Sequence, residues 1–137
     1  MANQVVARFT DGRTLKGTCL DIAPERPKCH VRTVEGEMVP VLLRDLKALF
    51  IVKSVDGDAK HVEGRDIAPV DARLRGTKLI EVSFHDGEKI VGLTTRYPPL
   101  APFFFVVPVD TDSNNQRILV NKEQIESMRL VDVSETC

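Results

Sequence analysis

The residues of this sequence that could do chemistry are few. Cys29 and His30 are adjacent, and a thiol beside an imidazole could begin a zinc site or a Cys-His nucleophilic site. A structural zinc needs about four ligands, however, and the remaining Cys and His residues show no pairing at ligand spacing. Neither Cys19 nor Cys29 lies in an activating sequence context. We therefore expect no metal site, no cofactor and no catalytic residues, and predict that the protein is not an enzyme.

Residues 110–114, Asp-Thr-Asp-Ser-Asn, resemble the first ligands of a calcium-binding loop. The full loop pattern requires Gly at its sixth position and Glu at its twelfth, and Asn115 and Asn121 stand there instead. The segment is better explained as a polar loop between two strands.

Basic residues outnumber acidic ones in the first 34 residues, six against three. Lys28, His30 and Arg32 would share one face of a strand, because side chains alternate between the two faces of a sheet. Together with Arg8 they form a candidate surface for a nucleic acid or nucleotide. That strand has no aromatic side chains on which bases could stack.

The segment 97–105, Tyr-Pro-Pro-Leu-Ala-Pro-Phe-Phe-Phe, contains the single Tyr and three of the six Phe residues of the chain. In a strand, Phe103 and Phe105 face one way and Phe104 the other, so one core cannot bury all three. The excess either packs against another part of the chain or forms an exposed apolar patch for a protein partner or a second copy. The candidate partner-binding residues are Tyr97, Pro99, Leu100, Phe103 and Phe105.

A repeat shows which elements must position these residues. Phe9-Thr10-Asp11-Gly12, followed by Gly17, returns 75 positions later as Phe84-His85-Asp86-Gly87, followed by Gly92. An Asp-Gly pair between alternating apolar residues is a strong hairpin signal, because Gly accepts the positive φ of a tight turn. Later in the unit the offset becomes 79, which aligns Leu46 with Ile125. Internal repetition of this kind predicts two related units.

Each unit is predicted to have five short strands and one helical turn before the last strand. The strands are expected at residues 3–10, 13–22, 28–34, 38–43 and 50–53, with the turn at 44–49. The second unit should have strands at 78–85, 88–96, 103–109, 117–121 and 129–133, with its turn at 122–128. Gly17 is expected where a small barrel bends sharply. The fold class is therefore all-β, with two tandem five-stranded barrels of the SH3-like or Sm-like kind.

The domain boundaries follow from the repeat. We expect a first barrel at residues 1–54, a linker at 55–76 that packs on the barrels, a second barrel at 77–133 and a frayed tail at 134–137. The linker is rich in charged and turn residues, but its apolar residues favour contact with the barrels.

Residues 6–17, Val-Ala-Arg-Phe-Thr-Asp-Gly-Arg-Thr-Leu-Lys-Gly, are followed by a Pro-x-x-Pro loop and by Asp45-Leu46-Lys47-Ala48-Leu49-Phe50. This run resembles an uncharacterised family of small bacterial proteins, whose second half is similar to residues 82–88 and 108–115. The resemblance covers nearly the whole chain and implies two related barrels without an assigned activity. The turn-and-Gly pattern is also similar to the first motif of Sm-like proteins, although their second motif, with its RNA-contacting Arg-Gly, is missing from both units.

The composition is that of an ordinary globular protein of 137 residues, with 42% hydrophobic and 28% charged residues and a formal net charge of -1. This balance argues against a strongly basic nucleic-acid binder or a polybasic membrane surface. The N-terminus lacks the features of a signal peptide, and no apolar run reaches the length of a membrane span, so we expect a cytoplasmic location and no membrane partner. The leading hypothesis is a protein-interaction or adaptor module, with protein partners or self-association, and the alternative is nucleic-acid or nucleotide binding.

Overall fold

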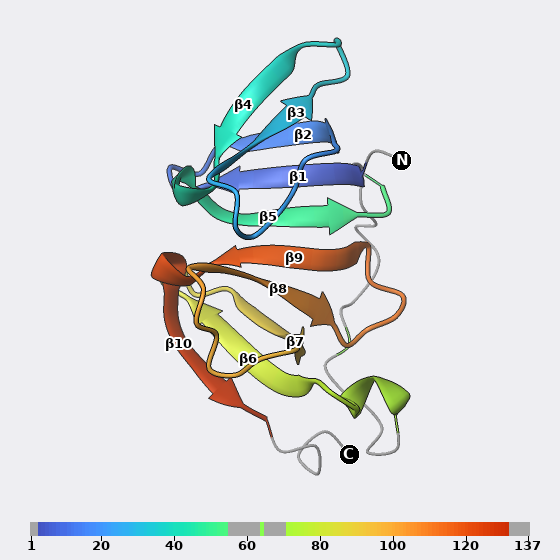
Figure 1. Cartoon of the computed structure of the whole chain (residues 1–137), viewed down its shortest axis with the longest axis vertical. Helices are drawn as coiled ribbons and strands as arrows, with labels where there is room; N and C mark the ends of the chain where they lie inside the picture. Colours follow the sequence, from blue (N-terminus) through green and yellow to red (C-terminus); the bar gives the residue numbers. More distant parts are fainter. Residues whose placement is uncertain (1–2, 55–63, 65–70, 132–137) are drawn as a thin grey trace.

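The computed structural model describes residues 3–54, 64 and 71–131 of the chain. Over these residues the protein is all-β, as predicted, and its ten antiparallel strands form one open sheet in the order β10-β6-β7-β8-β9-β5-β1-β2-β3-β4 (Figure 1). The strands of the first half are β1 (Asn3–Phe9), β2 (Thr14–Cys19), β3 (Lys28–Arg32), β4 (Met38–Leu42) and β5 (Leu46–Val52). Those of the second half are β6 (Lys78–Phe84), β7 (Lys89–Thr94), β8 (Phe103–Pro108), β9 (Asn115–Asn121) and β10 (Ile125–Leu130).

The predicted helical turns are shorter than expected. Single 3-10 turns at η1 (Leu43–Asp45) and η3 (Lys122–Gln124) precede β5 and β10, and a third, η2 (Ala72–Leu74), precedes β6. The residues expected to continue the first two turns already belong to strands, because β5 pairs with β1 from Leu46 onward and β10 pairs with β6 from Ile125 onward. Pairing with strands distant in the sequence outweighs the local helical preference.

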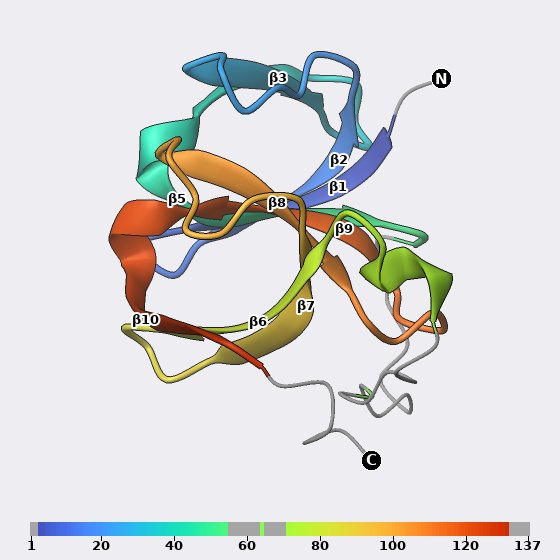
Figure 2. The same cartoon turned by 60° about the horizontal axis from the view of Figure 1, so that its bottom comes forward.

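Two strands at the centre of the sheet join the halves. β5 pairs with β9, with Leu49 opposite Leu119 and Phe50 opposite Ile118. Every residue of β5 is buried, and successive side chains enter different cores. Leu49 packs in the core of the first half, whereas Phe50 packs in that of the second. β5 and β9 therefore form a layer between the two cores, as Figure 2 shows.

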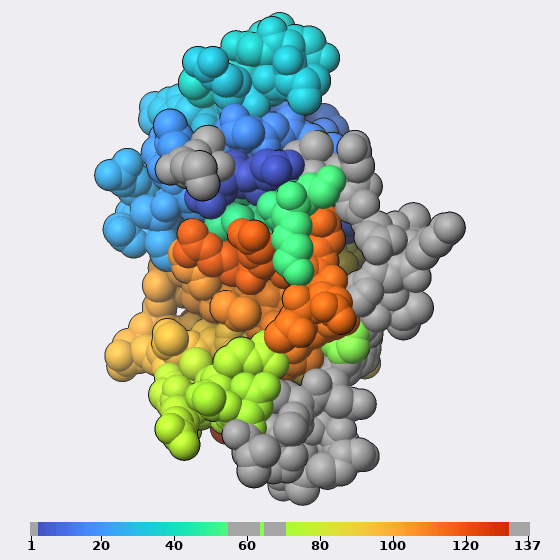
Figure 3. Space-filling view, turned by 90° about the vertical axis from the view of Figure 1, so that its right-hand side faces the viewer, coloured from blue at the N-terminus to red at the C-terminus, as the bar shows by residue number. Residues whose placement is uncertain are grey.

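The ends of these central strands also touch. The backbone N–H of Lys53 donates to the carbonyl of Asn114 at 2.8 Å, and the Lys53 ammonium donates to the carbonyl of Thr111 at 3.0 Å. Figure 3 shows this contact, with the end of the first half (green) lying on the loop between β8 and β9 (orange). The halves are thus held together by backbone pairing of β5 with β9 from Ala48 to Val52.

The repeated Asp-Gly pairs form the hairpin turns predicted from the sequence. Gly12 and Gly87 have φ values of 93° and 92°, and their N–H groups donate to Phe9 and Phe84 at 3.0 and 2.9 Å. Such φ values are readily adopted by Gly because it lacks a Cβ. The side chains of Asp11 and Asp86 accept backbone hydrogen bonds two residues on, which explains the Asp at each turn.

The second repeated glycine is required by close packing. A Cβ on Gly17 would lie 2.2 Å from the carbonyl oxygen of Arg32, and one on Gly92 would lie 2.6 Å from that of Val107. At these points β2 meets β3, and β7 meets β8. At Gly17, where the sequence predicted a sharp bend, two backbones approach so closely that only Gly is accommodated.

Most of the predicted linker, and the predicted tail at 134–137, lie outside the described residues. Within the described part of the linker, Leu74 packs against a small third cluster formed by Leu79, Leu93 and Val109. Among the residues that the structure describes, no helix is long and apolar enough to cross a membrane.

Candidate functional site

An apolar groove in the second half contains most of the residues predicted to bind a partner. It has a volume of about 650 Å³ and is lined by the end of β7, the loop that follows it and the start of β8. We call it the β7–β8 groove; it is lined by Pro24, Arg73, Thr77, Leu93, Thr94, Thr95, Arg96, Pro99, Leu100, Ala101, Phe103, Phe104, Phe105 and Val107. Four of the five predicted partner-binding residues are therefore brought together.

The fifth, Tyr97, does not line the groove. Its ring packs against the core of the second half, and its hydroxyl donates to the carbonyl of Met128 on β10 at 3.3 Å. Tyr97 thus links the loop after β7 to the edge strand of the sheet.

The groove exists because β7 and β8 separate. Their ladder consists of the pairs Gly92–Pro108 and Leu93–Val107, after which the two strands diverge. Backbone groups of β8 are left facing the gap. The N–H of Lys122 donates to the carbonyl of Pro102 next to the β8–β9 ladder. Because bonded and non-bonded pairs alternate along an antiparallel ladder, the backbone groups of Phe103 and Phe105 point away from β9 and into the groove.

The three Phe side chains alternate as the sequence predicted. Phe104 is buried in the core of the second half, while Phe103 and Phe105 are half-buried and pack against the core of the first. The guanidinium of Arg117 lies 4.6 Å from the centre of the Phe105 ring. The rings of Phe103 and Phe105 thus pack against the first half and also line the groove, and a partner for this surface stays a prediction. Among the large apolar side chains of the groove, Leu100 is the most exposed, at 71%.

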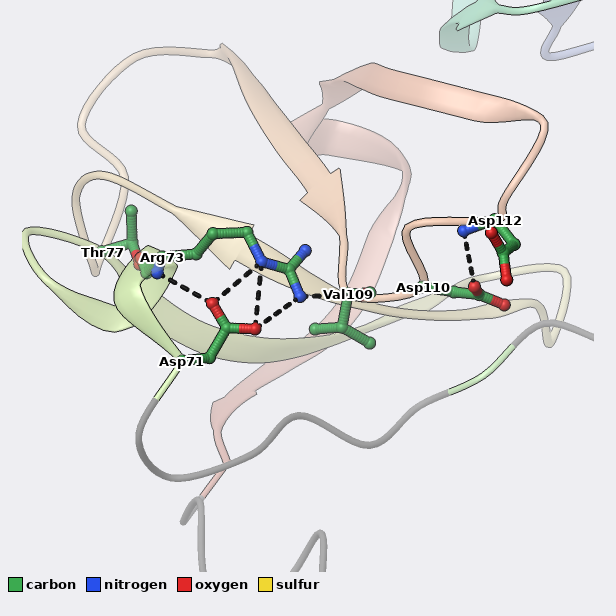
Figure 4. Close-up of polar contacts among 6 residues, drawn as sticks. All are labelled: Asp71, Arg73, Thr77, Val109, Asp110 and Asp112. Carbon is green, nitrogen blue, oxygen red and sulfur yellow. Dashed lines mark hydrogen bonds and ion pairs between the residues drawn. The ribbon is translucent and has the colours of Figure 1, made fainter.

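Arg73, at one side of the groove, is held by a fixed set of partners (Figure 4). Its guanidinium donates to the carboxylate of Asp71 at 3.0 Å and to the carbonyl of Val109 at 3.0 Å. Hydrogen bonds from Arg73 hold the pKa of Asp71 below its usual range. Thr77, which also lines the groove, donates its hydroxyl to the Arg73 carbonyl. The charge of Arg73 on this side of the groove is therefore already compensated by Asp71.

The polar segment after β8 is a loop between two strands, as expected. One carboxylate oxygen of Asp110 accepts the N–H of Asp112 at 2.9 Å (Figure 4). The other accepts the N–H of Gly64 at 2.8 Å. Across the described residues there is no group of three or more His, Cys, Asp or Glu side chains able to hold a metal ion.

A second cluster joins the two cysteines to a carboxylate and a histidine. Asp21 accepts hydrogen bonds from the backbone N–H of His30 at 2.9 Å and from the Cys19 thiol at 3.2 Å, and its other oxygen lies 2.8 Å from His30 Nδ1. These His30 contacts hold the pKa of Asp21 far below its usual range. A hydrogen bond with Cys29 and burial raise the pKa of Cys19. The same hydrogen bond lowers the pKa of the Cys29 thiol.

The predicted basic residues are only partly gathered. Lys28, His30 and Arg32 alternate with buried residues along β3 and share one face, as expected. Arg8 lies elsewhere, 3.9 Å from Glu88 and 5.0 Å from the centre of the Phe50 ring, at the junction of the halves. The carboxylate of Asp21 at His30 also reduces the positive charge of the β3 face. The hypothesis of nucleic-acid binding stays a prediction.

Sequence reasoning missed one wall of the groove. Leu93, Thr95 and Arg96 belong to the β7 side, and nothing in their types singles them out. Their role depends on where the β7–β8 ladder ends. The repeated Gly92 was the one signal for this wall, because the ladder between β7 and β8 has only two pairs and they lie at Gly92 and the residue after it.

The fold and groove define an all-β protein of two repeated halves with an apolar groove. The chain belongs to a family of unknown function, DUF6982, whose model matches residues 1–132. This agrees with the uncharacterised family that the sequence resembles. No curated protein matches the chain significantly, and neither does any solved structure.

Proposed function

We propose that the protein is a non-enzymatic interaction module that binds an extended, apolar segment of a protein partner in the β7–β8 groove. The observation that carries this proposal is the coincidence of an apolar lining with the free backbone groups of Phe103 and Phe105. An added strand gains affinity from main-chain hydrogen bonds and specificity from alternate side chains. The apolar lining selects apolar side chains on the segment.

The proposed architecture supports this function. We infer that each half is an SH3-like or Sm-like barrel. Three features support this inference: the same order of strands in both halves, a 3-10 turn before the last strand of each, and a hydrophobic core in each. Small barrels of this kind present edge backbone to ligands without needing catalytic groups. We assign the Asp21–His30–Cys19 cluster to the stability of the first half, because Asp21 ties the segment after β2 to His30 on β3.

The test uses extended peptides selected from a random peptide library on the wild-type protein. We expect selected peptides with apolar residues at alternate positions, and binding of such a peptide should slow hydrogen exchange at the amides of Phe103 and Phe105. Leu100→Asp should weaken binding at least tenfold, because it places a carboxylate on an exposed apolar wall.

Leu20→Asp is the matched control, since Leu20 is 77% exposed and lies outside the groove. Both variants replace an exposed Leu, so folding should be retained in each. If no apolar peptide is selected, or if Leu20→Asp and Leu100→Asp bind alike, the groove is not the binding site.

A further inference from the structure

The two outer strands of the sheet are related by the repeat to two strands that pair with each other inside the molecule. β4 and β10 are the outer strands and lie at opposite ends of the molecule (Figure 1). By the repeat, β4 is the counterpart of β9, and β10 is the counterpart of β5. Since β5 pairs with β9 within the chain, the equivalent contact between chains would join β10 of one copy to β4 of another. We propose that the protein self-associates head to tail through this β10–β4 pairing.

The repeat also sets the register of the proposed pairing. Leu49 and Ile51 of β5 correspond to Met128 and Leu130 of β10, whereas Leu119 and Arg117 of β9 correspond to Pro40 and Met38 of β4. In the internal ladder Leu49 lies opposite Leu119 and Ile51 lies opposite Arg117. Met128 of one copy therefore lies opposite Pro40 of the next, and Leu130 lies opposite Met38.

Two exposed apolar side chains meet in this register. Met38 is 53% exposed and Leu130 is 51% exposed in the single chain, although both belong to strands. Opposite residues of antiparallel strands contact one another directly. The head-to-tail pairing would thus cover an apolar side chain on each edge.

The backbone of each edge points in the direction that the pairing needs. The hydrogen bond from Val131 to Leu79, 2.9 Å, continues the β10–β6 ladder. By the alternation of bonded and non-bonded pairs, the backbone groups of Met128 and Leu130 point away from β6. These backbone groups can therefore pair with another strand. The Met128 carbonyl in addition accepts a hydrogen bond from the Tyr97 hydroxyl.

On β4, the bonds from Leu43 to Pro27 (3.0 Å) and from Thr33 to Glu37 (2.9 Å) lie at the two ends of the ladder with β3. The same alternation makes Pro40, opposite His30, a non-bonded pair whose backbone faces the open edge. Proline has no N–H, so an incoming strand receives no hydrogen bond from this position.

The residue opposite Pro40 does not need that donor. The carbonyl of Met128, which faces the open edge of β10, already accepts the hydroxyl of Tyr97 at 3.3 Å. The missing N–H of Pro40 thus meets a carbonyl with a hydrogen bond of its own. Pro40 disfavours pairing with a strand whose opposite carbonyl would be left without a donor. On β10 the opposite carbonyl belongs to Met128, which already has a donor in Tyr97.

A pair of opposite charges supports the same register. Within the chain, Lys47 of β5 reaches the second Asp-Gly hairpin and forms ion pairs with Asp86 at 2.7 Å and with Glu88. The counterpart of Lys47 is Glu126 on β10, and the counterparts of Glu88 and Asp86 are Arg13 and Asp11 in the first hairpin. Arg13 already pairs with Asp11 at 2.7 Å. The proposed contact therefore places Glu126 of one copy near this pair in the next, with Arg13 as its partner of opposite charge.

Sedimentation velocity on the full chain tests the proposal. The wild type should associate in a concentration-dependent way, whereas Leu130→Lys and Met38→Lys should each weaken association at least tenfold. Leu100→Lys is the matched control, because Leu100 is an exposed Leu that belongs to neither edge strand. A wild type that stays monomeric at about 1 mM, where a complex with a Kd of 1 mM would be visible, overturns the proposal. So does association that neither edge variant weakens.

Mixing the two edge variants tests the head-to-tail arrangement. Leu130→Lys keeps an intact β4, and Met38→Lys keeps an intact β10. Each variant alone should be monomeric, and their equimolar mixture should form a heterodimer and nothing larger. A mixture that remains monomeric while the wild type associates overturns the β10–β4 pairing in favour of like edges joining like.

Reversing the charge pair tests the register. Arg13→Glu and Glu126→Arg should each weaken association about threefold, as expected for an exposed ion pair. The double variant should regain most of the wild-type affinity. Additive losses in the double variant overturn the assigned register.

Discussion

In the ion pairs of Lys47, the Lys side chain is much more buried than its two acidic partners. We therefore predict that removing the carboxylates and removing the ammonium change the stability by different amounts. The Lys47 side chain is 11% exposed, whereas those of Asp86 and Glu88 are 56% and 37% exposed. Its ammonium also lies 4.7 Å from the centre of the Phe84 ring. The carboxylates can return to water when the pair is lost, but the ammonium has little access to it.

The carboxylates and the ammonium are removed in separate variants. Asp86→Asn with Glu88→Gln leaves the buried ammonium without a counter-charge, and we expect a loss of about 2 to 3 kcal/mol in the free energy of unfolding. Lys47→Met leaves two hydrated carboxylates and a side chain of similar length, and we expect a loss of about 1 kcal/mol or less. Asp86→Asn retains an oxygen to accept the backbone N–H of Glu88, so the hairpin is preserved.

Thermal and urea denaturation at pH 7 measures the difference. For a chain of this size the double variant should lower the Tm by roughly 10 °C, and Lys47→Met by roughly 3 °C. Urea midpoints should fall in the same order with an unchanged slope. A Lys47→Met variant that is less stable than the double variant would refute the assignment of the burial penalty to the ammonium.

The other predictions concern the first half. Gly17→Ala should destabilise the protein by more than about 2 kcal/mol, because its Cβ would lie 2.2 Å from the Arg32 carbonyl oxygen. Gly12→Ala should cost only about 1 kcal/mol, because its Cβ meets no atom within 4 Å and only the positive φ is strained. Urea denaturation of both variants measures this difference. The pKa of Asp21 is lowered on folding, so its contribution to stability is present above the unfolded value of about 3.9 and is lost as the pH falls through the folded value. Asp21→Asn should therefore flatten the dependence of stability on pH below about pH 4, and an unchanged acid slope would contradict this.

Much of the fold could be predicted from the sequence because its signals are local. The Asp-Gly hairpins, the alternation of Phe103 to Phe105 and the glycine of the close approach each depend on the backbone geometry of a few neighbouring residues. The all-β class follows from these signals and their repetition.

The groove could be predicted only in part. Its Phe-rich wall was visible as an excess of aromatic residues, but the β7 wall was not, because it depends on where the ladder between two strands ends. The cluster of Asp21 with His30 joins residues nine positions apart through the meeting of two strands, and no pattern in the sequence marks that contact.

The sequence by itself determined that the chain repeats an all-β unit, where each unit turns, and which segment carries surplus aromatic residues. Only the tertiary structure decided how the units join, because the pairing of β5 with β9 is between strands far apart in the chain. It also decided that β5 serves two cores, with Leu49 on one side and Phe50 on the other. Strand pairing is made by backbone groups that every residue but proline possesses, so side-chain types alone cannot specify which edges meet and which stay open.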